Sequence, residues 1–178
     1  MSLSSSSLSP IYCKTVIKRR IQLLSSLVGE SKTKSNILKF LQDNYEGRCV
    51  SEGYVRTGSI EIIQISAGLN YKEFTIFNVE FECLICLPVK NMLLKCVINK
   101  PVTKAGIHAD IVGETPSPMS IFIARDNHYN VDAFSNVQKG DQINVRVLVY
   151  RYQLNDKFIT VIGQLVMDDE NEDKRSKN

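Results

Sequence analysis

The stretch LKCVINKPVTKAGIHADI, residues 94–111, places one histidine and two lysines around a short turn. Its apolar residues predict two strands joined by a turn at residues 103–106. A simple hairpin requires neither His108 nor the flanking Lys100 and Lys104. A flat ring beside ammonium groups is, however, the combination that binds single-stranded nucleic acid, through base stacking and contacts to phosphates. The residue types therefore predict a polyanion-binding surface on this hairpin.

The elements that must position these residues form a predicted β-barrel from about residue 88 to 167. Five apolar runs, MLLKCVIN, GIHADIV, MSIFIA, QINVRVLVYRYQL and FITVIGQL, are separated by the turn sequences TKAG, ETPSP, QKGD and LND. Five short strands with turns at this spacing match the five-stranded Greek-key oligonucleotide-binding barrel. The longer segment RDNHYNVDAFSNVQ has room for one short turn of 3₁₀ or α-helix.

The first half of the chain has a different pattern. IYCKTVIKRRIQLL alternates and predicts an edge strand with a charged outer face, and residues 48–88 are rich in the β-branched and aromatic residues typical of strands. Between them, apolar residues at helical spacing predict one amphipathic helix from about residue 32 to 45. Ser31 or Ser35 is expected to cap its N-terminus, and Gly47 to close its C-terminus.

The predicted fold class is therefore α+β, mostly β. One helix on an antiparallel sheet is followed by a five-stranded oligonucleotide-binding β-barrel. The expected divisions are a disordered Ser-rich start at 1–10, an N-terminal domain at 11–87, the barrel at 88–167 and a disordered charged tail at 168–178.

The net charge of +3 is too small for a strongly basic nucleic-acid clamp, but its distribution is uneven. Residues 88–167 carry nine basic and six acidic groups, whereas residues 168–178 carry three and five. The barrel is thus mildly basic, which permits polyanion binding.

Enzyme chemistry finds no support in the sequence, which lacks a P-loop, a GxGxxG motif, a nucleophile elbow and an HExxH motif. No catalytic residue, metal or cofactor is therefore expected. Cys83 and Cys86 have CxxC spacing, but no second pair completes a zinc site, and we expect buried structural thiols. The five scattered cysteines and the lack of a signal peptide predict an intracellular protein that is not secreted.

The barrel resembles the S1 RNA-binding domain in the segments VTKAGIHADI, MSIFIARD, VQKGDQINVRVL and DKFITVIGQL. Gly140-Asp141 fits the family's turn before the fourth strand, whereas Asn91 and Met92 stand where the family usually has glycine. From YEGRCVSEGYV to LICLPVKNMLLKCVINKPVTKAGIHADI, the chain is similar to the S1-bearing stalk subunit of DNA-directed RNA polymerase. This family contains the seventh subunit of eukaryotic polymerase II and its archaeal counterpart.

The resemblance covers roughly residues 11–167 with patchy motif identity, so the chain is identified as a divergent member. Abundant Asn, Ile and Lys would suit a polymerase of a large DNA virus. The resemblance implies a noncatalytic subunit whose N-terminal domain docks on large polymerase subunits and pairs with a smaller helical stalk partner. Its barrel would bind nascent single-stranded RNA, in the nucleus, a viral transcription compartment or the virion. The alternative is a free-standing S1-type RNA-binding protein in translation or RNA decay, with a dimerising N-terminal domain.

By this resemblance, His108 and Phe122 fall at the two S1 positions whose rings stack bases. The complete predicted RNA-binding set is Lys100, Lys104, His108, Phe122, Arg125, His128, Tyr150 and Arg151. A different interpretation stays open for both rings. An isolated strand histidine is more often a hydrogen-bonded surface residue, and Phe122 could belong to the core because Ile121 and Ile123 compete for the inward face.

The segment EGYVRTG supplies the predicted docking residues. In the stalk family the matching loop contacts the polymerase core, which implies docking through Glu52, Gly53, Tyr54 and Val55. Tyr54 is expected to be an exposed aromatic at the loop tip that, with Val55, anchors the interface, because hot spots favour aromatic side chains in desolvated pockets. The alternative is an ordinary tight hairpin in which Tyr54 lies across a strand.

Overall fold

The computed structural model describes residues 11–127, 134 and 137–166, and the chain divides into two compact units. The first contains residues 1–87 and Gln153–Lys157, and the second contains residues 88–152 and 158–178. The Ser-rich start and the charged tail lie outside the described residues. In the part of the chain that is described, no helix is long and apolar enough to span a membrane.

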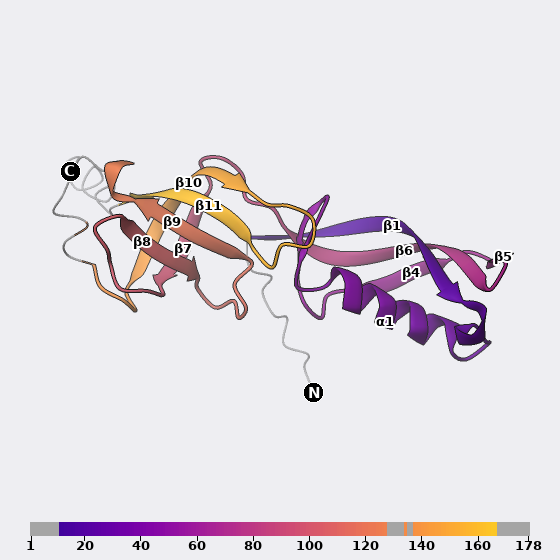
Figure 1. Cartoon of the computed structure of the whole chain (residues 1–178). Coiled ribbons are helices and arrows are strands. Elements are labelled where there is room, and N and C mark those ends of the chain that lie inside the picture. Colours follow the sequence, from indigo (N-terminus) through magenta and orange to yellow (C-terminus); the bar gives the residue numbers. More distant parts are fainter. Residues whose placement is uncertain (1–10, 128–133, 135–136, 167–178) are drawn as a thin grey trace, which may run out of the picture. The chain divides into compact units, whose positions relative to one another are not determined.

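The first unit is one helix on an antiparallel sheet (Figure 1). The central strand is β6, which pairs with β1 along one edge and with β3, β4 and β5 along the other. The predicted edge strand, β1, is confirmed at the end of the sheet order. The elements are β1 (Tyr12–Leu24), the 3₁₀ turn η1 (Ser25–Leu27), α1 (Thr33–Tyr45), β2 (Cys49–Val50), β3 (Gly53–Val55), β4 (Glu61–Ile65), β5 (Leu69–Tyr71) and β6 (Phe74–Cys86).

The predicted helix is confirmed as α1, but its start differs from the prediction. No side-chain cap is present, so neither Ser31 nor Ser35 fills the expected role. Instead, the Thr33 hydroxyl donates to the Gly29 carbonyl at 2.8 Å and accepts from the Gly29 N–H at 3.0 Å. This pair of bonds ties the first helical residue to the preceding turn.

The core of the first unit lies between α1 and one face of the sheet. Ile37 and Leu41, one helical turn apart, are completely buried. They belong to one cluster with Phe77, Val79 and Phe81, which alternate along β6 and therefore share a sheet face. Burial of each such side chain contributes about 1.5–3 kcal/mol, which makes this the stabilising face of the sheet.

The residues Gln153–Lys157 belong to the first unit through two backbone hydrogen bonds. The Cys49 N–H donates to the Asp156 carbonyl at 2.8 Å, and the Asn155 N–H donates to the Cys49 carbonyl at 2.9 Å. A segment distant in sequence thus joins the short strand β2.

The second unit is a closed five-stranded barrel with the order β10-β11-β9-β8-β7 (Figure 1). All neighbours are antiparallel except β9 and β11, whose parallel pairing closes the barrel. The predicted fold class, α+β with an oligonucleotide-binding type of barrel, is confirmed. The elements are β7 (Leu93–Ile98), β8 (Gly106–Ile111), β9 (Met119–Ala124), the 3₁₀ turn η2 (Arg125–Asn127), β10 (Gln142–Arg151) and β11 (Ile159–Val166).

Candidate nucleic-acid interface

His108 and Phe122 are direct partners on neighbouring strands β8 and β9. Their ring centroids lie 4.9 Å apart with an interplanar angle of 46°. Both side chains are half-buried, whereas Ile107, Ile121 and Ile123 are completely buried inside the barrel. The two rings therefore face outward together, and the alternative that Phe122 belongs to the barrel core is wrong.

The turn before β8 sets the position of His108. The backbone N–H and the hydroxyl of Thr103 both donate to the Gly106 carbonyl, at 3.1 and 3.0 Å. Gly106 has φ of 156°, and a Cβ at this position would lie 2.2 Å from the Ile123 carbonyl oxygen. Only glycine permits this close approach of β8 to β9.

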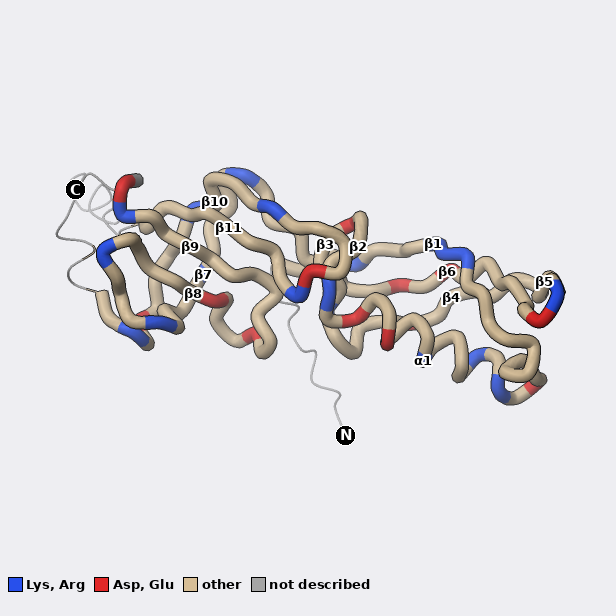
Figure 2. The backbone as a smooth tube through the Cα atoms, viewed as in Figure 1, with Lys and Arg blue, Asp and Glu red and all other residues tan. Residues whose placement is uncertain are grey.

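Figure 2 shows lysines and arginines at several places along the backbone of the barrel. The Arg125 N–H donates to the Ala105 carbonyl at 3.1 Å, so Arg125 lies beside the turn that carries the exposed Lys104. The exposed Lys100 lies in the loop that leads into this turn. The structure thus gathers three predicted cations at the turn end of the ring pair.

The remaining residues of the predicted RNA-binding set lie farther from the ring pair or outside the described residues. Arg151 pairs with the exposed Thr160, on the outward face two strands from Phe122. Tyr150 pairs with the buried Val161 and therefore lies on the opposite sheet face from the rings. His128 lies outside the described residues.

Two polar residues beside the rings, Asn99 and Asp110, were not predicted from the sequence. The Asn99 amide donates from Nδ2 to Asp110 Oδ2 at 2.6 Å, and the Asn99 N–H donates to the His108 carbonyl at 3.1 Å. Asp110 follows His108 by two residues on β8, which is the spacing of a shared strand face. The spacing of His108 and Asp110 could therefore have indicated from the sequence that Asp110 lies beside the rings. The contact with Asn99 could not be predicted, because it depends on the pairing of β7 and β8.

The predicted docking segment is placed differently from the expectation. Tyr54 is 2% exposed and Val55 is fully buried, because β3 pairs with β6 and puts Tyr54 opposite Cys86. A Cβ on Gly53 would lie 2.6 Å from the Cys86 carbonyl oxygen, so this hairpin is pressed against the sheet. The expectation of an exposed aromatic at a loop tip is therefore wrong, and the alternative of a tight hairpin holds.

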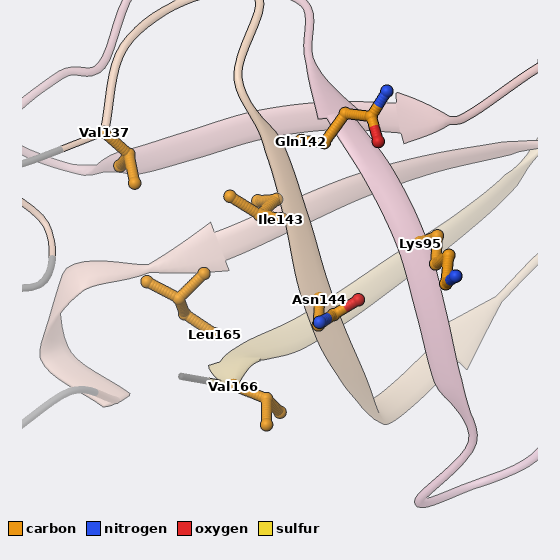
Figure 3. Close-up of a pocket in the computed structure, with 7 residues that line it drawn as sticks. All are labelled: Lys95, Val137, Gln142, Ile143, Asn144, Leu165 and Val166. Carbon is orange, nitrogen blue, oxygen red and sulfur yellow. The ribbon is translucent and has the colours of Figure 1, made fainter. Parts of the chain in front are cut away.

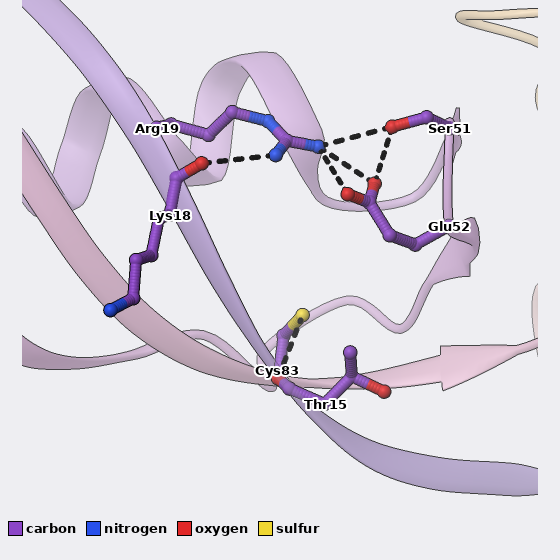
Figure 4. A network of polar contacts seen from close by, with 6 residues as sticks. All are labelled: Thr15, Lys18, Arg19, Ser51, Glu52 and Cys83. Carbon is purple, nitrogen blue, oxygen red and sulfur yellow. Dashed lines mark hydrogen bonds and ion pairs between the residues drawn. The ribbon is translucent and has the colours of Figure 1, made fainter.

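Glu52 is the member of that segment with a polar partner network (Figure 4). Arg19 on β1 donates to both Glu52 carboxylate oxygens, at 2.8 and 2.7 Å, and the Ser51 hydroxyl donates to one of them at 2.7 Å. Burial alone would raise the pKa of Glu52, but the hydrogen bonds from Arg19 and Ser51 outweigh it and hold this pKa below its usual value. The network fastens the β2–β3 hairpin to the edge strand.

Glu52→Gln is expected to lower the free energy of unfolding by about 0.5–1 kcal/mol near neutral pH, because it removes a partly exposed charged pair. A depressed carboxyl pKa stabilises the fold above the unfolded pKa of about 4.3, and this contribution is lost as pH falls through the folded pKa. The difference in free energy of unfolding between wild type and variant should therefore become smaller at about pH 3. Urea unfolding at both pH values measures it, with the exposed Glu73→Gln as control. A difference independent of pH would contradict the ionic role of Glu52.

Four of the five cysteines are buried, and only Cys13 is exposed. Cys83 and Cys86 are both buried, at 1% and 0% exposure. Burial raises the pKa of the Cys49 and Cys83 thiols to about 11, and that of Cys96 to about 12. These three thiols stay protonated at neutral pH and are poor nucleophiles. Among the described residues, no group of His, Cys, Asp and Glu has the arrangement of a metal site.

A cavity of about 390 Å³ lies on the barrel at the ends of β10 and β11 (Figure 3). Its described lining contains one cation, Lys95, together with two side-chain amides and four apolar residues. No nucleophile or carboxylate lines it, so this cavity offers no catalytic arrangement within the described residues.

The chain was compared with known protein families and with curated proteins. No family model matches the chain. A curated protein of Acanthamoeba polyphaga mimivirus, named "Putative DNA-directed RNA polymerase subunit", is 29% identical over 175 residues. The chain is thus similar to a viral protein that bears this name. The alignment covers 88% of this chain and 82% of the relative, so it must include residues of both units.

Proposed function

We propose that the chain is a noncatalytic subunit of a multisubunit DNA-directed RNA polymerase and that its barrel binds nascent single-stranded RNA. The similarity to the mimivirus polymerase subunit supports the place in transcription. The outward ring pair His108–Phe122, with cations at its turn end, carries the RNA-binding part of the proposal.

The expected binding is weak and tolerant of sequence. Each stacked base contributes about 1–3 kcal/mol. About four phosphate contacts to a single strand give a log–log salt dependence near −3. Such a surface retains an emerging transcript by stacking and electrostatics without requiring one sequence.

Docking on the polymerase needs an exposed surface on the first unit, and Tyr54 does not provide it. Instead, Leu24 and Tyr71 both pair with the half-buried Phe74, which puts all three on the sheet face opposite α1. Leu24 is 44% exposed, Tyr71 58% and the nearby Leu69 65%. We assign docking to this apolar row, because exposed apolar clusters are typical of protein interfaces.

The partners that follow are the large polymerase subunits and a smaller helical stalk subunit. The site of action would be a viral transcription compartment, the virion or the nucleus. A free-standing S1-type RNA-binding protein would need neither partner, and co-purification separates the two proposals.

Replacing Leu69 and Tyr71 together by serine is expected to reduce co-purification of large polymerase subunits with the tagged chain by about tenfold, which corresponds to 1.4 kcal/mol. Ile63→Ser is the matched control, because Ile63 is also exposed, at 55%, on β4 of the same unit. Quantitative mass spectrometry of the captured proteins measures the ratio. Capture of ribosomal proteins in place of polymerase subunits by the wild type would refute the polymerase proposal. Equal capture of polymerase subunits by the double variant and by Ile63→Ser would refute docking through the apolar row, but not the polymerase proposal.

A further inference from the structure

Asp110 lies beyond His108 from the turn that carries Lys104, and it forms a polar pair with Asn99. Along β8, Gly106 and the turn with Lys104 precede His108 by a few residues, and Asp110 follows it by two. Residues i and i+2 of a strand share a face and lie about 6–7 Å apart. The ring pair is therefore flanked by positive charge at one end and by a carboxylate at the other.

The Asp110 carboxylate keeps acceptor sites beyond its contact with Asn99. Asn99 Nδ2 donates to Asp110 Oδ2, while the buried Asn99 Oδ1 has no hydrogen-bond partner among the described residues. A carboxylate has about four acceptor sites, and this contact occupies one of them.

This arrangement matches the edge of one kind of base. A nucleotide whose phosphate lies at Lys104 and Arg125, and whose base stacks on His108, turns the outer edge of that base toward Asp110. Guanine presents only donors at the adjoining N1 and N2 positions, which suit the two oxygens of a carboxylate. Uracil presents one N–H between two carbonyl oxygens, which a carboxylate repels.

We infer that Asp110, positioned by Asn99, reads the base stacked on His108 and favours guanine over uracil. The inference rests on the proposed RNA-binding function and adds a base preference to it. The phosphate-binding end and the base-reading end are then separated by the rings.

The test compares a short oligouridine with the same oligomer carrying one central guanosine, both titrated against the full-length chain. We expect about tenfold tighter binding of the guanosine oligomer, within the range of one good bidentate base contact. Inosine, which lacks the N2 amino group, should lose part of this preference, and 7-deazaguanosine, which keeps N1 and N2, should retain it.

Asp110→Asn keeps an acceptor for Asn99 but puts a donor where guanine needs an acceptor, so the preference should fall to about one. Asp126→Asn is the matched control, because it removes a carboxylate beside Arg125 and should change the affinity for both oligomers equally. Asp110→Ser provides a second variant, with circular dichroism as the check of folding.

The outcomes distinguish this inference from the function on which it rests. A preference that disappears in the Asp110 variants supports it. Equal binding of both oligomers, with dependence on His108 and Phe122 intact, overturns the base preference and leaves RNA binding in place. Absence of binding to either oligomer overturns both.

Discussion

Replacing both His108 and Phe122 by alanine is expected to weaken binding of single-stranded RNA by about thirtyfold or more. Each ring stacks one base, and each stacked base contributes about 1–3 kcal/mol. The barrel should remain folded, because both side chains point away from the buried Ile107, Ile121 and Ile123. Fluorescence anisotropy with a labelled oligonucleotide measures affinity, and thermal unfolding by circular dichroism measures stability.

Two further variants make the experiment specific to stacking. Leu93→Ala removes an exposed apolar side chain, 60% accessible, from β7 of the same barrel and should leave RNA affinity unchanged. His108→Phe keeps a flat ring and should retain most of the affinity, since stacking depends on the ring face. If affinity falls only in proportion to loss of folded protein, the stacking role of the two rings is wrong.

Tyr54→Ala is expected to lower the free energy of unfolding of the first unit by about 3–5 kcal/mol, as for other large buried aromatic side chains. Tyr54 is 2% exposed and lies on a strand paired with the central β6. Loss of polymerase binding by this variant would therefore report unfolding. Urea denaturation, with hydrogen exchange followed at residues 11–87, measures the change in this unit.

Tyr71→Ala is the matched control, because it removes the same side chain from an exposed position. Tyr71 is 58% exposed, and Lys72 Nζ lies 5.6 Å from its ring centroid. The loss of this exposed cation–π contact should cost less than about 1 kcal/mol. Similar losses of stability in the two variants would contradict the buried role of Tyr54.

Local patterns in the sequence were sufficient to predict the helix α1 and the five barrel strands. The helix at α1 followed from apolar residues at helical spacing, and the five barrel strands from apolar runs bounded by turn residues. Both signals depend on neighbouring residues only, since helix and strand periodicity are properties of a short segment. The predicted cap at Ser31 or Ser35 was wrong, because no side chain caps the helix and Thr33 instead bonds to Gly29 in the preceding turn, a contact that the capping pattern does not predict.

The candidate site could be predicted only in part. Alternation along β9 allows Phe122 or its neighbours to face the interior, and the choice depends on how β8 and β11 flank that strand. The burial of Tyr54 follows from pairing with β6, and the contact between Asn99 and Asp110 follows from the pairing of β7 with β8.

The sequence by itself therefore determined the helix, the five barrel strands, the fold class and the residue types available for RNA binding. Only the tertiary structure decided that His108 and Phe122 share an outward face and that Tyr54 belongs to the core. It also decided that the polar pair of Asn99 and Asp110 lies beside the rings. The physical reason is that periodicity gives each strand two faces, whereas the choice of the buried face depends on pairing between segments far apart in the chain.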